Sequence, residues 1–255
     1  MTIQVGLTLP SFVDDPEVPI AVARAAEDAD LDGVFVYDHL WRGDHPNRRP
    51  ALECFAMLGA IAAETRRVHI GPLVARATLR PAATLANSLA TVQRVSGGRL
   101  IAAIGAGDSL SRNENEAYGL EFGSMVDRVN ALHAAVRAVA KHDYPVWVAG
   151  RAAPVRQMVA VADGWNSWGT DPVRFEREAA LVRDVAPHAV LTWGGLARPL
   201  EEGADELGAR LQPYVDAGAT WIIVGPVDSG NPANATVLGE VRARLNDAPD
   251  GLAEQ

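Results

Sequence analysis

The chain contains 255 residues and is 48% hydrophobic and 22% charged, a composition typical of a folded globular protein. Its net charge of −9 argues against nucleic-acid binding, which requires a basic surface, and no apolar run approaches the ~18 residues that span a membrane. The single cysteine, Cys54, excludes an internal disulfide, and the N-terminal MTIQVGLTLP lacks the basic start of a signal peptide, so we expect a cytoplasmic protein.

Short apolar runs alternate with longer helical patterns along the chain. Most of the short runs are continuously apolar, which is typical of parallel strands buried on both faces. We predict eight strands: Ile3–Leu9, Gly33–Tyr37, Val68–Val74, Leu100–Ile104, Val146–Ala149, Gly164–Ser167, Ala189–Thr192 and Trp221–Val224.

Amphipathic helices are predicted between these strands, because apolar residues recur there at helical spacing. One helix covers Pro16–Asp30 and a second begins at Pro81. A third follows Ser124, which forms a capping-box pattern with Asp127. A fourth carries the apolar stripe of 207–215.

Eight strand–helix units in this length predict an α/β fold, namely a single (β/α)8 TIM barrel over residues 1–245 with a flexible tail at 246–255. A doubly wound open sheet is the alternative. In both folds ligands bind at the carboxyl ends of the strands, so the residues that follow each strand are the candidates for a site.

Asp38 and His39 follow the second predicted strand, in GVFVYDHLW. A carboxylate beside an imidazole is a plausible acid/base pair, because histidine titrates near neutral pH. The alternative is a turn in which both residues cap the next helix.

A glycine-rich loop follows the fourth predicted strand, in GGRLIAAIGAGDSLS. Gly105 and Gly107 have no side chain, so a flat ligand could approach the backbone closely there, and Asp108 could bind it by hydrogen bonding. Glycines spaced in this way after a strand are common, so the loop alone is not diagnostic.

Arginines follow the third and fifth predicted strands. Arg76 and Arg80 could meet an anionic ligand, but we expect them to be solvent-exposed, as most arginines are. Gly150 and Arg151 precede a helix start, where free backbone N–H groups and a positive charge could bind a phosphate. A plain turn is the alternative.

Other chemistries lack their sequence patterns. The six histidines show no compact ligand spacing, so we expect no metal site, and no phosphate-binding P-loop or serine-nucleophile motif is present. Cys54 lies in the apolar run ALECFAML and is interpreted as a core residue. Trp165 and Trp168 could stack on a flat ring, although tryptophans more often serve packing.

Taken in order, these segments resemble the luciferase-like family of flavin- or deazaflavin-dependent oxidoreductases. Each segment is loosely matched alone, but their shared order almost from end to end is specific. The matching segments are IQVGLTLP, GVFVYDHLW, ETRRVHIGPLV, RPAATLANSLATVQRVSGGRLIAAIGAGDS, ENEAYGLEF, MVDRVNAL, PVWVAG, AVADGWN and ATWIIVGPV.

The resemblance implies a (β/α)8 barrel that holds a flavin-type ring at its C-terminal mouth. It makes His39 and Asp38 the catalytic pair beside the reactive ring. It also implies two sets of cofactor-binding residues: Val74, Ala75, Gly105, Ala106, Gly107, Asp108 and Asn113 around the ring, and Gly150, Arg151 and Ala152 at its phosphate-bearing tail.

Two features depart from the family pattern. Only Lys141 to Tyr144 remain of the segment that normally precedes the fifth strand and often helps to cover the active site. The pocket is therefore expected to be open, or shaped by a partner chain. Arg151 stands where relatives often have glycine or serine, which could strengthen binding of an anionic tail or change which tail fits.

The family contains two chemistries, and both stay open. We expect an oxidoreductase that transfers a hydride between coenzyme F420 and a small organic substrate, with His39 as the acid/base. The alternative is an FMN-dependent two-component monooxygenase that uses O2 and a separate reductase. A second alternative is a non-catalytic, shortened flavin-binding barrel.

The substrate and the assembly are less closely defined by the sequence. Four aromatic residues could line an apolar pocket and favour a hydrophobic or aromatic small-molecule substrate: Phe12, Trp41, Trp168 and Trp193. The resemblance makes a homodimer the expected assembly, and we expect neither nucleic acid nor membrane as a partner.

Overall fold

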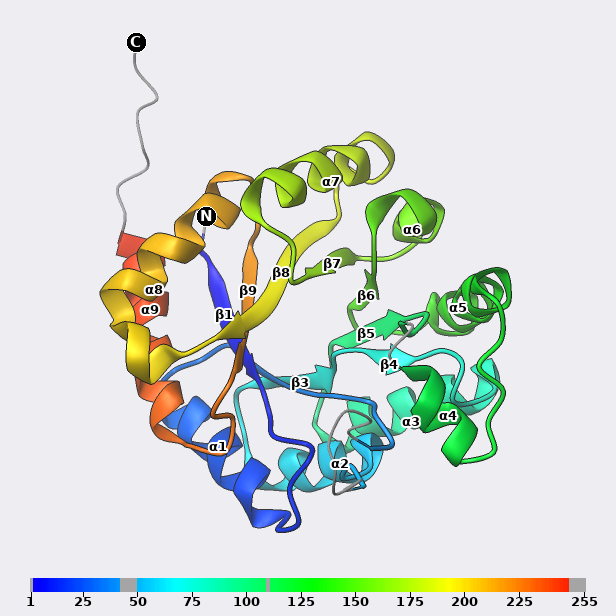
Figure 1. The fold of residues 1–255 in the computed structure, drawn as a ribbon, viewed down its shortest axis with the longest axis horizontal. Coiled ribbons are helices and arrows are strands. Elements are labelled where there is room, and N and C mark those ends of the chain that lie inside the picture. The colour runs from blue at the N-terminus through cyan, green and yellow to red at the C-terminus, as the bar shows by residue number, and fades with distance from the viewer. Residues whose placement is uncertain (1, 42–49, 109–110, 248–255) are drawn as a thin grey trace.

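The structure is a computed structural model that describes residues 2–41, 50–108 and 111–247. Its centre is one parallel sheet with the strand order β3-β2-β1-β9-β8-β7-β6-β5-β4 (Figure 1). The strands are β1 (Gln4–Thr8), β2 (Gly33–Val36), β3 (His69–Pro72), β4 (Ala75–Arg76), β5 (Ala102–Gly105), β6 (Val146–Ala149), β7 (Gly164–Trp168), β8 (Val190–Ala197) and β9 (Trp221–Pro226).

The sheet closes on itself through β4, a short strand that lies just beyond the end of the predicted strand Val68–Val74. The structure forms that predicted strand only over β3, and the additional strand β4 pairs with β5. A parallel bridge between Ile70 and Leu100 joins β3 to the residues just before β5. The (β/α)8 barrel is thus confirmed.

Helices surround the strands in Figure 1, and four of them cover the four predicted amphipathic segments. They are α1 (Glu17–Asp28), α2 (Cys54–Glu64), α3 (Ala82–Val95), α4 (Arg112–Ala117), α5 (Met125–Val139), α6 (Ala152–Val159), α7 (Pro172–Val185), α8 (Pro199–Asp216) and α9 (Ala233–Asp247). The predicted capping box is present at the start of α5, where Ser124 and Asp127 exchange hydrogen bonds. Among the helices described, none combines the length and apolar character needed to cross a bilayer.

Aromatic rings fill the interior of the barrel toward the N-terminal ends of the strands, which is the end opposite the mouth. Trp147 on β6 lies 5.4 Å from Trp221 on β9 and 5.9 Å from Phe35 on β2, measured between ring centroids. Glycines admit these rings: a Cβ at Gly164 would lie 2.6 Å from the Trp147 ring, and one at Gly33 would lie 3.1 Å from Trp221. A ligand must therefore bind above this layer, at the mouth.

Two chain segments bear on the predicted boundaries. Six residues, 140–145, connect α5 to β6, which is the short connection that the sequence predicts. Helix α9 continues to Asp247, and Asn246 hydrogen-bonds both the backbone N–H and the carbonyl of Ile3. The first two residues of the predicted tail are thus helical, while 248–255 lie outside the described residues.

The interior aromatic layer predicts a large stability cost for Trp147→Ala. This side chain is buried, so its removal leaves a cavity and should lower the free energy of unfolding by about 3–5 kcal/mol. Urea unfolding followed by circular dichroism measures the change. The control is Val95→Ala at an exposed position on α3, for which we expect a change within about 0.5 kcal/mol. Equal effects of the two substitutions would contradict the assignment of a packed interior.

Candidate functional site

Polar side chains from three strand ends meet at the C-terminal mouth of the barrel. His39 follows β2, Arg76 ends β4, and Glu114 lies on α4 in the segment that follows β5. The Glu114 carboxylate is 2.8 Å from Nδ1 of His39 and 2.7 Å from Nη1 of Arg76. The fold thus brings together side chains that are far apart in the sequence.

Glu114 is the centre of this cluster. It is buried, and besides the two side chains it accepts backbone hydrogen bonds from Leu40 at 2.8 Å and Trp41 at 3.3 Å. Burial alone would raise its pKa, but the bond from His39, the Leu40 N–H and the charge of Arg76 lower it overall. Because an ionised carboxylate only accepts hydrogen bonds, Nδ1 of His39 carries the hydrogen, and Nε2 remains for proton exchange.

Asp38 and His39 are neighbours in the sequence, but the structure does not pair their side chains. The buried Asp38 carboxylate accepts hydrogen bonds from both terminal nitrogens of Arg80, at 2.7 and 3.0 Å. It also accepts the backbone N–H of Arg76 at 2.9 Å. Asp38 therefore anchors the arginines, while His39 has Glu114 as its partner.

The expectation that both arginines are solvent-exposed is wrong. The Arg76 side chain is 3% exposed and that of Arg80 is 18% exposed. Arg76 also donates to the Asp38 carbonyl at 2.8 Å, and Arg80 donates to Glu53 at 2.7 Å. The buried carboxylates need counter-charges, and this requirement holds both arginines inside the protein.

The glycine-rich loop lies beside this network, where Gly107 adjoins the Arg76 side chain. A Cβ at Gly105 would lie 2.6 Å from Cγ2 of Val74, so only glycine fits against that side chain. Gly107 has a φ of 74°, which favours glycine, and Ala106 is half-buried. Asp108 is exposed and accepts the N–H of Ser111 at 3.1 Å.

The remaining predicted cofactor residues occupy three different environments. Ala75 is fully buried where β4 pairs with β5. Gly150 has a φ of 138° and, with Arg151, directly precedes α6, whose N-terminus has no side-chain cap. The exposed Arg151 side chain lies 3.7 Å from the carboxylate of Glu178 on α7. Asn113 is exposed on α4 and lies outside the buried network.

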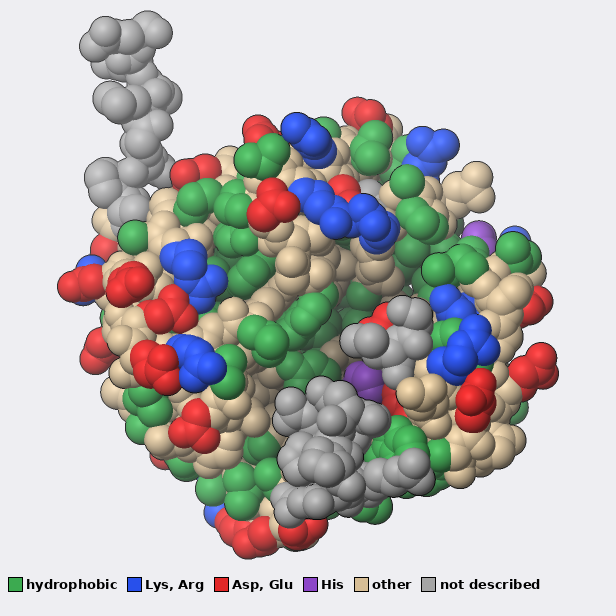
Figure 2. All heavy atoms as spheres, in the orientation of Figure 1, with side chains coloured by type: hydrophobic (Ala, Val, Ile, Leu, Met, Phe, Trp, Pro, Cys, Tyr) green, Lys and Arg blue, Asp and Glu red, His purple; other side chains and the backbone are tan. Residues whose placement is uncertain are grey.

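The opposite side of the mouth is apolar. Phe12 and Tyr37 flank the His39 ring at 5.9 and 6.3 Å, and Trp168 meets Tyr37 edge-on at 6.1 Å. Leu196, at the end of β8, is exposed. Figure 2 shows a hollow at the centre of this face that is lined by hydrophobic side chains, with a histidine at its edge.

Two other predicted pocket tryptophans belong to the packing outside the barrel. Trp193 stacks on Tyr214 with ring centroids 4.2 Å apart, and Trp165 stacks on Phe175 at 5.6 Å. Both are buried, and alternation along β7 and β8 turns them away from the barrel interior. Neither can line the mouth.

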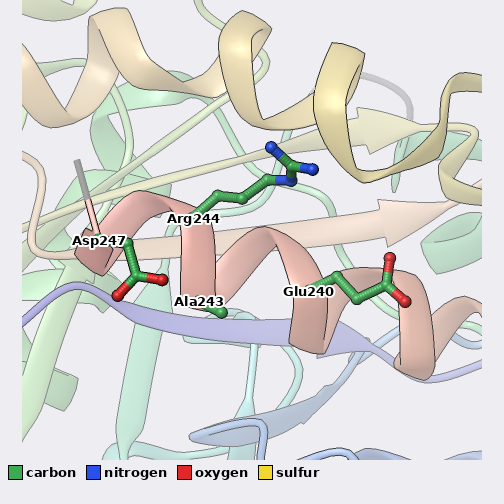
Figure 3. Close-up of a pocket in the computed structure, with 4 residues that line it drawn as sticks. All are labelled: Glu240, Ala243, Arg244 and Asp247. Carbon is green, nitrogen blue, oxygen red and sulfur yellow. The ribbon is translucent and has the colours of Figure 1, made fainter.

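A separate surface hollow of about 550 Å³ lies along α9, where Glu240, Ala243, Arg244 and Asp247 line it (Figure 3). Arg244 is paired with Asp205 of α8, and the hollow contains neither an aromatic ring nor a histidine. It offers surface charge alone, so the mouth is the candidate site. Over the described ranges, no group of three or more metal-binding side chains occurs.

Sequence reasoning missed Glu114 and its neighbour Asn115, which accepts from Arg76 at 3.1 Å. Both lie in ENEAYGLEF, which served only as one of the segments that carry the family resemblance. Their signal was available: α4 directly follows the glycine-rich loop and carries a carboxylate next to the exposed Asn113. That signal could not indicate which of its polar residues face inward.

The family model for luciferase-like monooxygenases matches residues 3–198. The chain belongs to this family. Membership makes it an oxidoreductase, so the family resemblance and the expectation of an enzyme are both confirmed.

Individual relatives are more distant. The chain is 33% identical to an F420-dependent glucose-6-phosphate dehydrogenase of Amycolatopsis mediterranei over 127 residues, which are 49% of this chain and 37% of the relative. This match therefore spans little more than a third of that protein.

Two solved structures show the same fold. An F420-dependent secondary alcohol dehydrogenase in complex with an F420–acetone adduct superimposes with a TM-score of 0.79 at 18% identity, covering 97% of this chain and all of the other. The oxygenating constituent of a diketocamphane monooxygenase from Pseudomonas putida, with FMN, gives 0.74 at 12% identity over 96% and 98%.

The buried position of Glu114 predicts a pH-dependent effect of Glu114→Gln. Because its native pKa lies below 4.5, ionised Glu114 stabilises the fold above pH 4.5, and this contribution is lost as the pH falls through the lowered value. At pH 7 we expect the variant to lose about 3–5 kcal/mol in free energy of unfolding, because Arg76 remains buried without its counter-charge.

Urea unfolding at pH 7 and at several values below 4.5 measures this difference. The matched control is Glu116→Gln on the same helix, where the side chain is exposed and little change is expected at any pH. A gap between wild type and Glu114→Gln that stayed constant down to low pH would refute the assigned ionisation.

Proposed function

We propose that this protein is an F420-dependent oxidoreductase that transfers a hydride between the deazaflavin and a small organic substrate. The observation that carries the proposal is His39, held by the buried Glu114 at the mouth and next to the glycine-rich loop. The F420-dependent proteins among its relatives and structural neighbours support the choice of cofactor.

The described residues fit a flat ring. Gly105 and Gly107 present backbone without side chains, Val74 is half-buried beside them, and the arginines beneath are held in ion pairs. In this proposal the ring binds against Val74 and the loop 105–108, whereas Ala75, predicted as a cofactor contact, is fully buried behind them and cannot touch the ring. Asn113 is accessible from the rim for a polar contact.

The phosphate-bearing tail is assigned to the segment after β6. Gly150 and Arg151 precede α6, whose first backbone N–H groups have no side-chain cap, and such groups bind anions. The exposed Arg151 adds a positive charge that can turn from Glu178 toward the tail.

When bound, F420 supplies or accepts the hydride. His39 exchanges the accompanying proton with the substrate through Nε2, since Glu114 holds Nδ1. Glu114 orients the imidazole, and Arg76 keeps Glu114 ionised. Asp38, predicted as the second catalytic residue, is proposed instead to fix the β2–β4 connection through Arg80 and the Arg76 backbone.

An FMN-dependent monooxygenase that uses O2 and a separate reductase is the second candidate function, and the FMN-containing structural neighbour favours it. A non-catalytic barrel fits less well, because it would have no need of a histidine held by a buried carboxylate. We propose a cytoplasmic homodimer as the working form of the enzyme.

Parallel titrations of the purified protein with F420 and with FMN test the cofactor. We expect F420 to bind clearly more tightly, as measured by changes in its absorbance or fluorescence. Tighter binding of FMN would favour the monooxygenase, and binding of neither would favour the non-catalytic barrel.

The role of His39 predicts that His39→Ala abolishes turnover while cofactor affinity stays nearly unchanged. Loss of a positioned acid/base should lower kcat by about 10²- to 10⁴-fold. Steady-state kinetics and a cofactor titration of the same preparation measure both quantities. Full activity in the variant would eliminate the proposed role.

A further inference from the structure

Three rings form one continuous lining on the substrate side of the mouth, named here the aromatic wall: Phe12, Tyr37 and Trp168. Tyr37 stands edge-on to Trp168, with ring planes at 85°, and at 68° to His39. Phe12 lies on the other side of His39, tilted by 55°. The imidazole therefore lies between two rings of this wall.

Two glycines on neighbouring strands leave room for the rings of Trp168 and Tyr37. Gly194 is paired in register with Trp168, and a Cβ at Gly194 would overlap ring carbon Cε3 of Trp168. The indole thus lies across the β8 backbone and remains 39% exposed to solvent. At Gly225, a Cβ would lie 3.1 Å from the Tyr37 hydroxyl, so that glycine lets Tyr37 reach across β1 toward β9.

The wall carries no charge. Tyr37 shares a hydrogen bond of 2.8 Å with Thr8, and burial raises the pKa of its phenol to about 12, so it stays neutral. The nearby Arg76 and Arg80 are bound by carboxylates. A sugar phosphate, the substrate of the Amycolatopsis relative, would find no cation among the three residues described here as the wall.

We propose that the aromatic wall binds an uncharged, planar conjugated carbonyl compound, with its π face on Trp168 and its oxygen toward His39. This assignment rests on the proposed function and defines its substrate class. An exposed indole favours stacking with a planar ring, and the His39 imidazole, which contacts Tyr37 as Trp168 does, supplies the polar group that an oxygen needs. A saturated ring of the same size lacks a flat face and should bind less well.

Binding of three probes tests the proposal by isothermal titration calorimetry: 1-tetralone, the saturated 1-decalone and glucose 6-phosphate. Each is titrated into the protein alone, with F420 and with FMN, so the result does not depend on which cofactor binds. We expect 1-tetralone to bind most tightly in at least one of these states. Its preference over 1-decalone should fall roughly three- to tenfold in Trp168→Ala and be largely restored in Trp168→Phe.

Gly194→Ala is the second variant, because its Cβ forces the Trp168 ring to move while a β-strand accepts alanine. This variant should also bind 1-tetralone more weakly, whereas Val95→Ala on α3 should leave the affinities for all three probes unchanged. Equal binding of the two ketones, tighter binding of glucose 6-phosphate, or a preference unaffected by Trp168→Ala would overturn the proposal. Retained 1-tetralone preference without binding of either cofactor would uphold the wall and refute the proposed function.

Discussion

The mouth of this barrel depends on one buried carboxylate. An ionised group inside a protein is tolerated only when hydrogen bonds and opposite charges replace water, and Glu114 receives them from His39, Arg76 and two backbone N–H groups. These donors come from the ends of β2 and β4, while the carboxylate comes from α4. One ion therefore fixes the relative positions of three segments and, with them, the ring that is proposed to move the proton.

The same constraint explains why Asp38 is proposed as a scaffold residue and not as a second catalytic acid. Arg76 is buried, so its guanidinium group needs acceptors besides Glu114. Its Nε donates to the backbone carbonyl of Asp38, and its backbone N–H donates to the Asp38 carboxylate. Asp38 then requires a counter-ion, which Arg80 supplies with two hydrogen bonds. The network therefore runs from His39 through Glu114, Arg76, Asp38 and Arg80 and reaches the surface at Glu53. Because the Asp38 carboxylate is buried and accepts three hydrogen bonds from the two arginines, it is proposed to hold the scaffold in place and not to contact the substrate.

The periodic parts of the fold were predictable because they depend on local patterns: continuous apolar strands, helical stripes and the Ser124 capping box. The site was only partly predictable. Neighbouring residues in extended backbone point in opposite directions, so the adjacency of Asp38 and His39 in the sequence was a poor guide to a contact between them. The true partner of His39 lies 75 residues later, and no local pattern encodes a contact across that separation. The early end of β3 was not predicted either, because VHIGPLV is apolar apart from His69 and reads as one strand up to Val74.

The two halves of the mouth differ because side-chain size differs around the barrel. After β5 the residues of the loop are small, with Gly105 packed against Val74, whereas the end of β2 and β7 supply the large rings of Tyr37 and Trp168. A flat cofactor suits the first half and an apolar substrate the second, with His39 flanked by the rings of the second half and bonded to the network beneath. The aromatic layer of Trp147 and Trp221 closes the barrel below, so both ligands must bind above it. In the proposed function this keeps cofactor and substrate close to each other at the mouth, and such proximity is what a hydride transfer requires.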